Sequence, residues 1–308
     1  MSTSTLLTPP PLQEVGKDAG TYDGEPVLDY VRPPQLLQTI IDTGASKGDL
    51  PVSKILVRGM FGGMFLAYGT AMAFFGIAQG LPPIVADALF PLGFICINLL
   101  QVDLATGYFA LVPVAYMNGK TTFGKMVRCI CWVYVANLIG SLIVAGLLWS
   151  ALTMLGNAPD ATGISKVLVK VGLLKTIHFE QFGMAGAWTA LIKGILCNWF
   201  VTLGVVLPYM TRSVIGKAIA TFVPIYMFFG MGWEHLVVNM FIMPSAMAFG
   251  AHITLADWWI GNELPVTIGN FIGGFLFTGA AIAFIYGTRG SRATPAGTGP
   301  REAPAPAR

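Results

Sequence analysis

The 308-residue chain is 55% hydrophobic and 11% charged, and its mean hydropathy is +0.69. Soluble domains carry about 25% charged residues, so this composition excludes an ordinary soluble fold and predicts a polytopic membrane protein. The net charge of +3 is too small to indicate a nucleic-acid partner.

The two ends of the chain differ in composition from the middle. Residues 1–31 and 288–308 are rich in small residues and proline, and the first segment lacks the apolar core of a signal peptide. Both are predicted to be disordered cytosolic tails flanking one transmembrane domain, residues 32–287. At its start, Pro33 and Pro34 are typical helix-start residues followed by apolar side chains on one face. We expect a short helix there, lying against the membrane or the base of the protein.

Six apolar stretches in the central domain are long enough to cross the bilayer core, which takes about 20 residues per helix. This pattern predicts an all-α protein with six transmembrane helices. The second and fifth stretches are too long for one crossing, and polar or glycine-rich sequence interrupts them near Asp103 and Glu234. Since irregular backbone at membrane depth is tolerated only inside protein or beside a cavity, both helices are predicted to be broken. The stretches centre on residues 59–79, 88–116, 127–150, 184–210, 218–248 and 264–286.

Lysine and arginine fall mainly on one side of these predicted helices. Fourteen of the eighteen lie in the two tails, in the segment before the first helix, or in the linkers 117–128 and 211–217. Under the positive-inside bias, both termini are predicted to be cytosolic. The predicted outer loop 151–183 departs from this bias. Its cations, Lys166, Lys170 and Lys175, indicate either a vestibule that attracts anions or an ordinary solvated helix face.

The central domain contains a weak internal repeat. Asn137-Leu-Ile-Gly140 in the third stretch matches Asn270-Phe-Ile-Gly273 in the sixth, and the two asparagines follow Asp103 and Glu234 by 34 and 36 residues. With three crossings in each half, the second half is inverted relative to the first. Inverted repeats with broken helices at matching positions indicate a substrate pathway near the middle of the membrane, between the half-helices.

Ionisable side chains at membrane depth cost about 2.5–3.5 kcal/mol each, so each needs a role. Asp103 and Glu234 are expected to hold free backbone N–H groups at the breaks rather than to contact a substrate. His235 lies in the second break, and because a neutral imidazole both donates and accepts hydrogen bonds, we expect it to line the pathway. Lys193 is expected at an interface. The asparagines expected to link helices are Asn137, Asn198, Asn239 and Asn270.

The sequence favours neither an enzyme nor a metal site. His178, His235 and His252 are too scattered for metal binding, and no Ser-His-Asp grouping or glycine-rich phosphate loop is visible. We therefore expect no cofactor and no metal. The cysteines lack the paired spacing of a zinc site and are expected to be buried as small apolar side chains: Cys96, Cys129, Cys131 and Cys197.

Five sequence blocks resemble the formate/nitrite transporter family, in order and at compatible spacing over about residues 33–287. The glutamate-histidine-x-x-x-asparagine pattern of the fourth block is specific. The resemblance implies an aquaporin-like protomer that forms a homopentamer, with one pore in each protomer. The blocks are Asp103-Leu-Ala-Thr-Gly107, Tyr134-Val-Ala-Asn-Leu-Ile-Gly140, Gly194-Ile-Leu-Cys-Asn198, Gly232-Trp-Glu-His-Leu-Val-Val-Asn-Met240 and Pro265-Val-Thr-Ile-Gly-Asn-Phe-Ile-Gly-Gly274.

The resemblance also assigns residues to the pore. It matches His235 to the family's central pore histidine and Thr106 to the threonine that hydrogen-bonds to this histidine. It matches Lys175 to an outer lysine that attracts anions, with Lys170 as the alternative. The apolar positions that narrow the pore match Leu104, Phe90, Phe94 and Phe228.

The resemblance implies transport of a small monovalent weak-acid anion, together with protons, across a lipid membrane. We expect nitrite as the anion and the plasma membrane as the location. Since a bare anion cannot cross a dry ring of Phe and Leu, it is expected to be protonated in the pore and to cross as the neutral acid. A channel or proton symporter for formate or another short carboxylate is the first alternative. A water or glycerol channel is more distant, because its paired Asn-Pro-Ala caps are absent and Asn157-Ala-Pro159 is in the wrong order.

Overall fold

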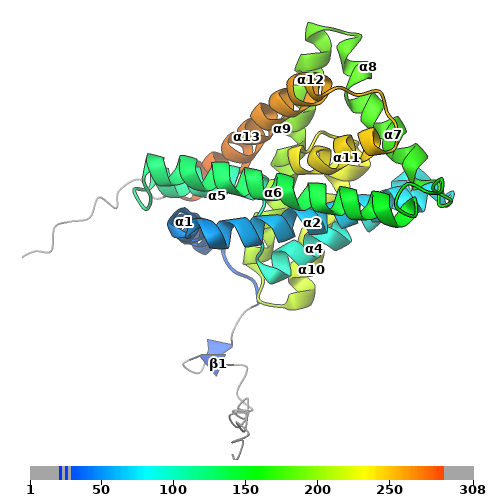
Figure 1. Cartoon of the computed structure of the whole chain (residues 1–308). Coiled ribbons are helices and arrows are strands. Elements are labelled where there is room, and N and C mark those ends of the chain that lie inside the picture. Colours follow the sequence, from blue (N-terminus) through cyan, green and yellow to red (C-terminus); the bar gives the residue numbers. More distant parts are fainter. Residues whose placement is uncertain (1–20, 23–24, 27–28, 288–308) are drawn as a thin grey trace, which may run out of the picture.

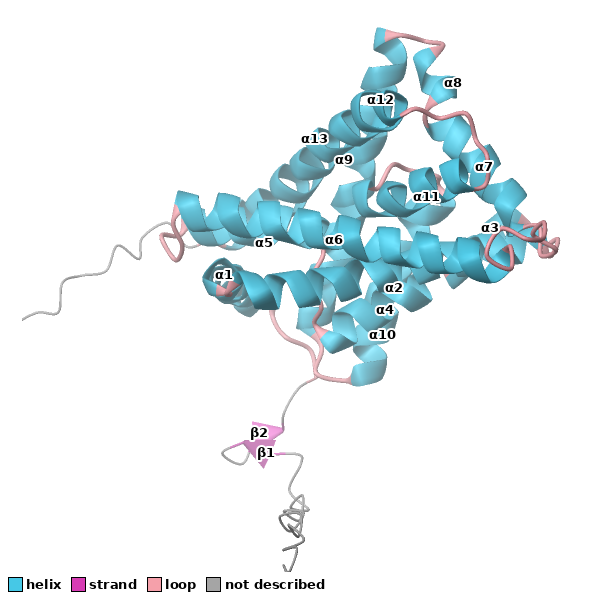
Figure 2. Ribbon diagram, in the orientation of Figure 1, coloured by secondary structure: helices cyan, strands magenta, loops and turns pink. Residues whose placement is uncertain are grey.

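The computed structural model describes residues 21–22, 25–26 and 29–287 (Figures 1 and 2). Most of the predicted tails, residues 1–20 and 288–308, lie outside the described residues. The described chain is almost entirely helical, as predicted. Its elements are β1 (Thr21–Tyr22), β2 (Glu25–Pro26), α1 (Pro33–Asp49), α2 (Val52–Ala78), α3 (Pro83–Ala86), η1 (Asp87–Leu89), α4 (Pro91–Leu100), α5 (Ala105–Met117), α6 (Phe123–Leu152), α7 (Ile164–Lys175), α8 (Ile177–Glu180), α9 (Met184–Val206), η2 (Leu207–Met210), α10 (Val214–Gly230), α11 (Leu236–Ala248), α12 (Leu255–Trp258), η3 (Trp259–Glu263), α13 (Leu264–Gly274), η4 (Phe275–Ala280) and α14 (Ala281–Tyr286).

Two pairs of long helices frame the molecule. α2 packs along α6, and α9 packs along α13 (Figure 1). Each pair approaches closely because glycines remove side chains from the contact. Gly63 lies against the backbone of Asn137, and Gly273 lies against the backbone of Ile195, so a Cβ at either glycine would collide with main-chain atoms. Small residues at such crossings let membrane helices pack without a driving force from water.

One helix in each half is broken near its middle, as the sequence predicted. The first break, residues 101–104, separates α4 from α5, and the second, residues 231–235, separates α10 from α11. Both α5 and α11 have 13 residues, and each contains one proline, Pro113 or Pro244. Each proline lies ten residues after the acid at its break, Asp103 or Glu234. The two halves therefore break their helices at corresponding positions.

Among the described residues, five helical segments are long and apolar enough to cross a membrane. Three shorter apolar helices accompany them, the half-helices α5, α10 and α11. The prediction of six spans counts each broken helix as one crossing. That count, and the inverted orientation of the second half, remain predictions. The five segments are Val52–Ala78, Pro83–Leu100, Phe123–Leu152, Met184–Met210 and Leu255–Tyr286.

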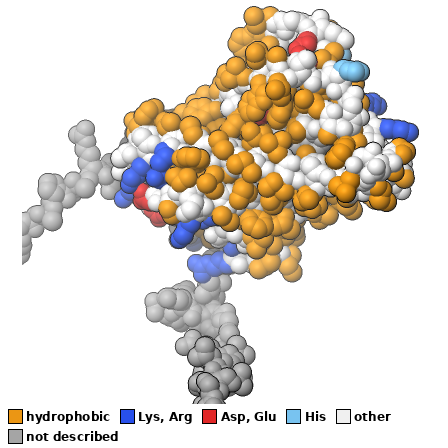
Figure 3. All heavy atoms as spheres, viewed as in Figure 1, with side chains coloured by type: hydrophobic (Ala, Val, Ile, Leu, Met, Phe, Trp, Pro, Cys, Tyr) orange, Lys and Arg blue, Asp and Glu red, His pale blue; other side chains and the backbone are white. Residues whose placement is uncertain are grey.

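The surface agrees with immersion in lipid. Figure 3 shows hydrophobic side chains over most of one face, with lysine and arginine gathered near two ends of the molecule. Large apolar side chains such as Ile215 and Phe284 are mostly exposed on this single chain. A surface of this kind is stable only against hydrocarbon or another protein. The chain is an integral membrane protein.

The helix expected at the start of the domain is α1, and it packs against the base of the protein. Its buried side chains Leu36, Leu37 and Ile40 lie in an apolar cluster with Leu111 of α5 and Val206 of α9. Pro33 and Pro34 occupy the first turn, where the missing N–H groups cost nothing. α1 therefore packs along the second half of α5, where Gly44 lies against Leu111 and Ala115, and its Lys47 side chain reaches the first break.

The segment just before α1 is held on the loop before α10. Asp29 accepts hydrogen bonds from the Thr211 hydroxyl at 2.8 Å and from the N–H groups of Arg212 at 2.8 Å and Ser213 at 3.0 Å. The hydrogen bond from Thr211, followed by those from Arg212 and Ser213, holds the pKa of Asp29 below its usual value of 3.8. The last residues of the predicted tail 1–31 are thus fixed to the domain.

Candidate functional site

His235 forms the N-terminal cap of α11 inside the second break. Its side chain is fully buried, and its Nδ1 accepts a hydrogen bond from the Val238 N–H at 3.2 Å. Its ring stacks on Phe228 with the ring centroids 5.6 Å apart. The imidazole is therefore held at Nδ1 by the first turn of α11 and on one face by the Phe228 ring. Since Nδ1 accepts, a neutral ring carries its proton on Nε2.

Aromatic side chains from both broken helices form an apolar wall beside His235. Phe90 contacts Phe228 edge to face at 5.5 Å and stacks on Phe229 with centroids 3.9 Å apart. Phe94 and Leu104, which were also assigned to the pore, are buried in the same core cluster. The structure thus brings the predicted apolar residues of α4 next to those of α10. A charged group at this wall would lose its water without gaining a charged partner.

Several buried polar atoms near the breaks have no hydrogen-bond partner among the described residues, and two of them belong to side chains that the resemblance assigned to the pore. These two are Nε2 of His235 and Oγ1 of Thr106, which lies in the first turn of α5. The Thr106 carbonyl, by contrast, accepts a hydrogen bond from the Asn198 side chain at 3.2 Å. Buried polar groups are nearly always paired, and unpaired ones are often completed by a ligand or water. These atoms are therefore able to receive a small polar molecule.

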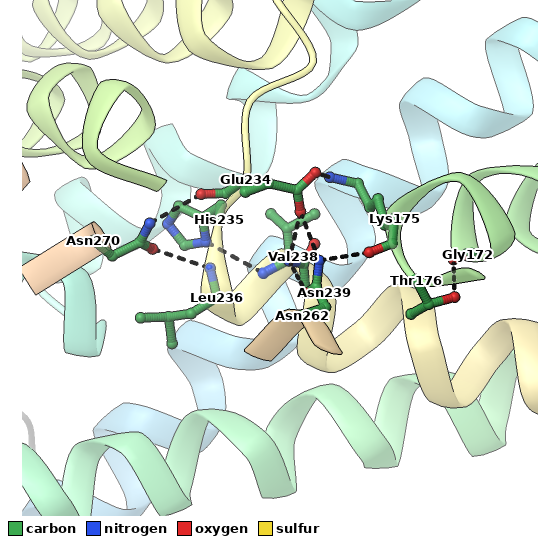
Figure 4. A network of polar contacts seen from close by, with 10 residues as sticks. All are labelled: Gly172, Lys175, Thr176, Glu234, His235, Leu236, Val238, Asn239, Asn262 and Asn270. Atoms are coloured by element: carbon green, nitrogen blue, oxygen red, sulfur yellow. Dashed lines mark hydrogen bonds and ion pairs between the residues drawn. The ribbon is translucent and has the colours of Figure 1, made fainter. Parts of the chain in front are cut away.

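A cluster of four side chains surrounds the second break, and we call it the outer cluster: Lys175, Glu234, Asn239 and Asn262 (Figure 4). The Lys175 ammonium donates to Oε1 of Glu234 at 2.8 Å. Oε2 of Glu234 accepts from Asn239 at 2.9 Å and from Asn262 at 3.2 Å, and Asn262 also donates to the Lys175 carbonyl. Both Glu234 oxygens are thus satisfied, one by a charge and one by two amides.

The first break has an equivalent arrangement on the side of α1. Asp103 is buried and forms ion pairs with Lys47 of α1 and with Nε of Arg58 of α2, the latter at 2.7 Å. Arg58 also donates to the carbonyl of Gln101, which adopts a left-handed conformation with φ 53°. A cavity of about 470 Å³ opens beside this group and is lined by Leu104 among others. We call it the inner cavity.

The inner cavity carries an excess of positive side chains. Its charged lining comprises one acid and three cations: Asp42, Lys47, Arg58 and Lys217. Two of these cations share Asp103, so the local charge stays positive. Cations in a partly enclosed space raise the local concentration of small anions. The charge of the inner cavity therefore favours small anions.

The roles expected for the two acids at the breaks are wrong. Asp103 and Glu234 were predicted to hold free backbone N–H groups, but their side chains bind cations and amides instead. Asparagines hold the backbone: Oδ1 of Asn137 accepts from the Ala105 N–H at 2.8 Å, and Oδ1 of Asn270 accepts from the Leu236 N–H at 3.0 Å. An amide can also donate to carbonyls, which a carboxylate cannot, so asparagine suits a break that exposes both kinds of group.

The lysines of the predicted outer loop separate into two kinds. Lys166 and Lys170 are exposed on α7, whereas Lys175 ends that helix and turns inward to Glu234. Of the two candidates for an outer anion-attracting lysine, only Lys175 reaches a break. Lys193 is half-buried, with its ammonium 5.4 Å from the centre of the Phe179 ring.

All four cysteines were predicted to be buried. This is correct for Cys129 and Cys197 and wrong for Cys96 and Cys131, which are exposed on the single chain. Both exposed cysteines lie on apolar helices, where a small side chain can face lipid as well as protein. In residues 29–287, no three His, Cys, Asp or Glu side chains lie close enough together to hold a metal ion.

Sequence reasoning missed three polar residues beside the breaks, Lys47, Arg58 and Asn262, and it also missed Glu263, which follows Asn262 in the chain. The sixth span was expected to begin at residue 264, which left Glu263 outside the membrane. The structure instead runs helix from Leu255 through the π-helical turn η3 into α13, and it buries Glu263 completely. Lys47 and Arg58 were read only as cytosolic charges. Nothing local in the sequence connects either cation with Asp103.

Comparisons with known proteins agree with this geometry. A sequence model of the family described as "Formate/nitrite transporter" matches residues 34–284. The "Uncharacterized transporter YrhG" of Bacillus subtilis is 31% identical over 83% of this chain and 94% of its own length. The "Formate channel FocA" of Escherichia coli K12 is 28% identical over 84% of this chain and 95% of its own.

Solved structures show the same fold. An "FNT family ion channel" superposes with a TM-score of 0.69 at 25% identity, covering 82% of this chain and 98% of its own. A "Pentameric formate channel with formate bound" superposes with a TM-score of 0.61 at 24% identity, over 76% of this chain and 97% of its own. These relatives are channels and transporters rather than enzymes. The chain is a member of the formate/nitrite transporter family and a transport protein, not an enzyme.

Proposed function

We propose that the chain conducts small monovalent anions of weak acids across the membrane, along a path lined by His235 and Thr106. The observation that carries this proposal is the pair of buried, unpartnered polar atoms beside an apolar wall, Nε2 of His235 and Oγ1 of Thr106. A carboxylic or nitrous acid has one donor and at least one acceptor, which matches what these two atoms offer. The family membership supports the same class of substrate.

The permeant crosses the wall as the neutral acid. The rings of Phe90 and Phe228 meet beside His235 and exclude water, so an unprotonated anion there would lose its hydration without compensation. Low polarity favours the protonated form of an acid. Transport of one anion is thus accompanied by one proton, taken up on one side of the wall and released on the other. Phe94 and Leu104 complete the constriction.

Positive charge on both sides prepares the anion for this step. The inner cavity presents Lys47, Arg58 and Lys217, and the outer cluster presents Lys175. The inner cavity has an excess of cations and concentrates anions before protonation, whereas at the outer cluster Lys175 offers an ammonium group whose charge Glu234 balances. A weakly positive mouth favours entry without holding the anion too tightly to leave.

Formate is the first substrate to test and nitrite the second. The names of several relatives, including the FocA proteins and the "Formate channel BtFdhC" of Bacillus thuringiensis at 30% identity, refer to formate. Our expectation of nitrite gains no support from these names. Both acids are small, planar and monovalent, so the wall alone does not separate them.

The deciding experiment is uptake of labelled formate and nitrite by vesicles that contain the purified protein, across an imposed pH gradient. We expect saturable uptake that is faster when the outside is acidic, and competition between the two anions. A vesicle without protein gives the leak of the neutral acids. Flux of water or glycerol without either anion would contradict the proposal.

We further propose a homopentamer in the plasma membrane with both termini in the cytosol. The pentameric formate channel of the same fold supports the assembly, and the cluster of cations beside α1 supports the orientation. Native mass spectrometry in detergent measures the number of chains. Protease digestion of intact cells tests the termini, since tags on either end should be protected.

A further inference from the structure

Glu263 is a fully buried acid that the proposed path does not use. It ends the π-helical turn η3 and follows directly on Asn262 of the outer cluster. Both side chains are completely buried, while Ile260 and Leu264 on either side are mostly exposed. π-Helical turns are rare and occur mostly at functional positions. The turn thus buries the two adjacent polar side chains of Asn262 and Glu263.

The immediate partners of Glu263 are neutral. Its Oε1 lies 3.2 Å from the Tyr134 hydroxyl on α6, and its Oε2 accepts from the Trp258 indole N–H at 3.1 Å. No lysine, arginine or histidine of the described residues forms an ion pair with it. An ionised carboxylate in such a place lacks the charge compensation that Asp103 and Glu234 each have. Burial without a cation favours the neutral acid.

The hydrogen bonds around Glu263 are complete in either protonation state. Tyr134 also lies 3.3 Å from the hydroxyl of Thr267, and either oxygen of that pair can be the donor. When Glu263 is ionised, the Tyr134 hydroxyl donates to it. When Glu263 is protonated, it donates to Tyr134, whose hydroxyl then turns to Thr267. Both protonation states of Glu263 are therefore satisfied, and a change between them requires only that the hydrogen bonds of Tyr134 and Thr267 reverse direction.

A proton at Glu263 changes the charge next to the outer cluster. Asn262, one residue earlier, donates to Glu234 at 3.2 Å and to the Lys175 carbonyl at 2.8 Å. Negative charge on Glu263 opposes the attraction of Lys175 for an anion and adds to the charge of Glu234. The titratable groups on or next to the elements packed around this turn and the outer cluster include Tyr134, Lys175, His178, Glu180, Lys193, Cys197, Glu234, His235 and Asp257.

We propose that Glu263 is a proton-binding site that tunes the outer cluster: protonated, it permits anion entry past Lys175, and ionised, it opposes entry. Glu263 acts through the charge of its neighbours and is a positioning residue of the path, not a group that touches the permeant. This inference rests on the proposed function for its effect on transport, but the protonation of Glu263 stands independently of it.

The first experiment measures that protonation without transport. Infrared spectra of the purified protein at neutral pH should contain a carbonyl band of a protonated carboxyl group, and Glu263→Gln should remove it. The band should fade as the pH is raised. Glu234→Gln is the control for assignment, because the band should persist in it. A wild-type spectrum without a band that depends on Glu263 would overturn the inference, whatever the protein transports.

The second experiment compares anion uptake by Glu263→Gln and wild type over a range of pH. The ratio of mutant to wild-type flux should be near one at acidic pH and rise several-fold at alkaline pH, where only the wild type gains negative charge. A purely structural defect would lower flux equally at every pH, and a flat ratio would contradict the proposal. Asp49→Asn changes an exposed acid at the end of α1, away from this turn, and as the matched control it should give a flat ratio.

Tyr134→Phe is a second variant that tests the proposed protonation of Glu263 if Glu263→Gln does not fold. This change removes the donor that stabilises the ionised acid, so the infrared band should persist to higher pH and the flux ratio should rise in the same direction. A band that fades at lower pH than in wild type would refute this arrangement of hydrogen bonds. If no variant and no wild type transports an anion, the proposed function fails while the infrared result still decides the state of Glu263.

Discussion

Asn137 and Asn270 make the same three hydrogen bonds, each at the break of a different helix. Asn137 donates to the carbonyls of Gly59 and Asp103 and accepts from the N–H that opens α5. Asn270 donates to the carbonyls of Gly194 and Glu234 and accepts from the N–H that opens α11. The distances range from 2.8 to 3.0 Å. One amide thus joins two helices and a break in each half.

Replacing either asparagine by alanine should destabilise the protein at its break. Three buried backbone groups lose a partner, and since each buried unpaired group costs about 1–3 kcal/mol, we expect a loss of at least about 3 kcal/mol for each variant. The measurement is the thermal unfolding midpoint of the protein in detergent. Asn157→Ala, which changes an exposed asparagine in the loop after α6, should leave the midpoint unchanged. Equal midpoints for Asn137→Ala, Asn270→Ala and wild type would contradict this account.

Removal of Lys175 should harm the protein more than removal of the whole ion pair. Lys175→Met leaves the buried Glu234 carboxylate with two amides and no cation, which costs about 3–5 kcal/mol in comparable buried pairs. The double variant Lys175→Met with Glu234→Gln removes both charges and should recover much of the stability. Thermal unfolding of the single and double variants measures the coupling. Lys170→Met, on the exposed face of the same helix, is the matched control and should be neutral.

Loss of the imidazole should change the pH dependence of transport more than the fold. His235→Phe removes both the unpaired Nε2 and the cap on the Val238 N–H, which is worth about 1 kcal/mol. His235→Asn keeps a capping side chain and removes only the imidazole. Both variants should assemble as wild type does and show flatter pH profiles of formate uptake. An unchanged profile in both would exclude His235 from proton transfer, and a defect confined to His235→Phe would assign it to the cap.

The contact of Asp29 should weaken in acid. Since the hydrogen bond from Thr211, and then those from Arg212 and Ser213, lower the folded-state pKa below 3.8, the contact stabilises the protein above the unfolded value. That contribution is lost as the pH falls through the lowered pKa. Hydrogen exchange of the peptide containing residues 211–217 should be faster in Asp29→Ala than in wild type at neutral pH. The two should converge in strong acid. Equal exchange at neutral pH would show that the contact does not hold this loop.

The sequence identified the breaks because apolar periodicity stops there. Asp103 and Glu234 are costly at membrane depth, and the asparagines follow them at nearly equal spacing, so the elements and their weak repeat could be predicted. The pathway role of His235 was predicted from its place in the second break, whereas that of Thr106 came from the resemblance. Their burial without partners came only from the structure. Tertiary contacts determine which polar side chains bind the backbone at a break and which bind a charged group. The sequence alone does not show these contacts.

The residues that sequence reasoning missed have partners far away in the chain. Lys47 was counted only as a charge on the predicted cytosolic side, because nothing local connects it with Asp103. Glu263 was placed outside the membrane, since the sixth apolar stretch was predicted to start at residue 264. In the structure Tyr134 and Trp258 bind its carboxyl group, so the acid is satisfied inside the protein. Local composition gave the wrong start for the last helix because a tertiary contact overrides it.

In both halves the cation is made before the acid that it neutralises. Lys47 precedes Asp103 by 56 residues, and Lys175 precedes Glu234 by 59. Since chains leave the ribosome from the N-terminus, each acid enters the membrane when its partner lysine has already been synthesised. The lysine that neutralises Asp103 or Glu234 is therefore already present when that carboxylate enters the hydrocarbon. The order of charges along the gene thus suits insertion of the two broken helices during synthesis.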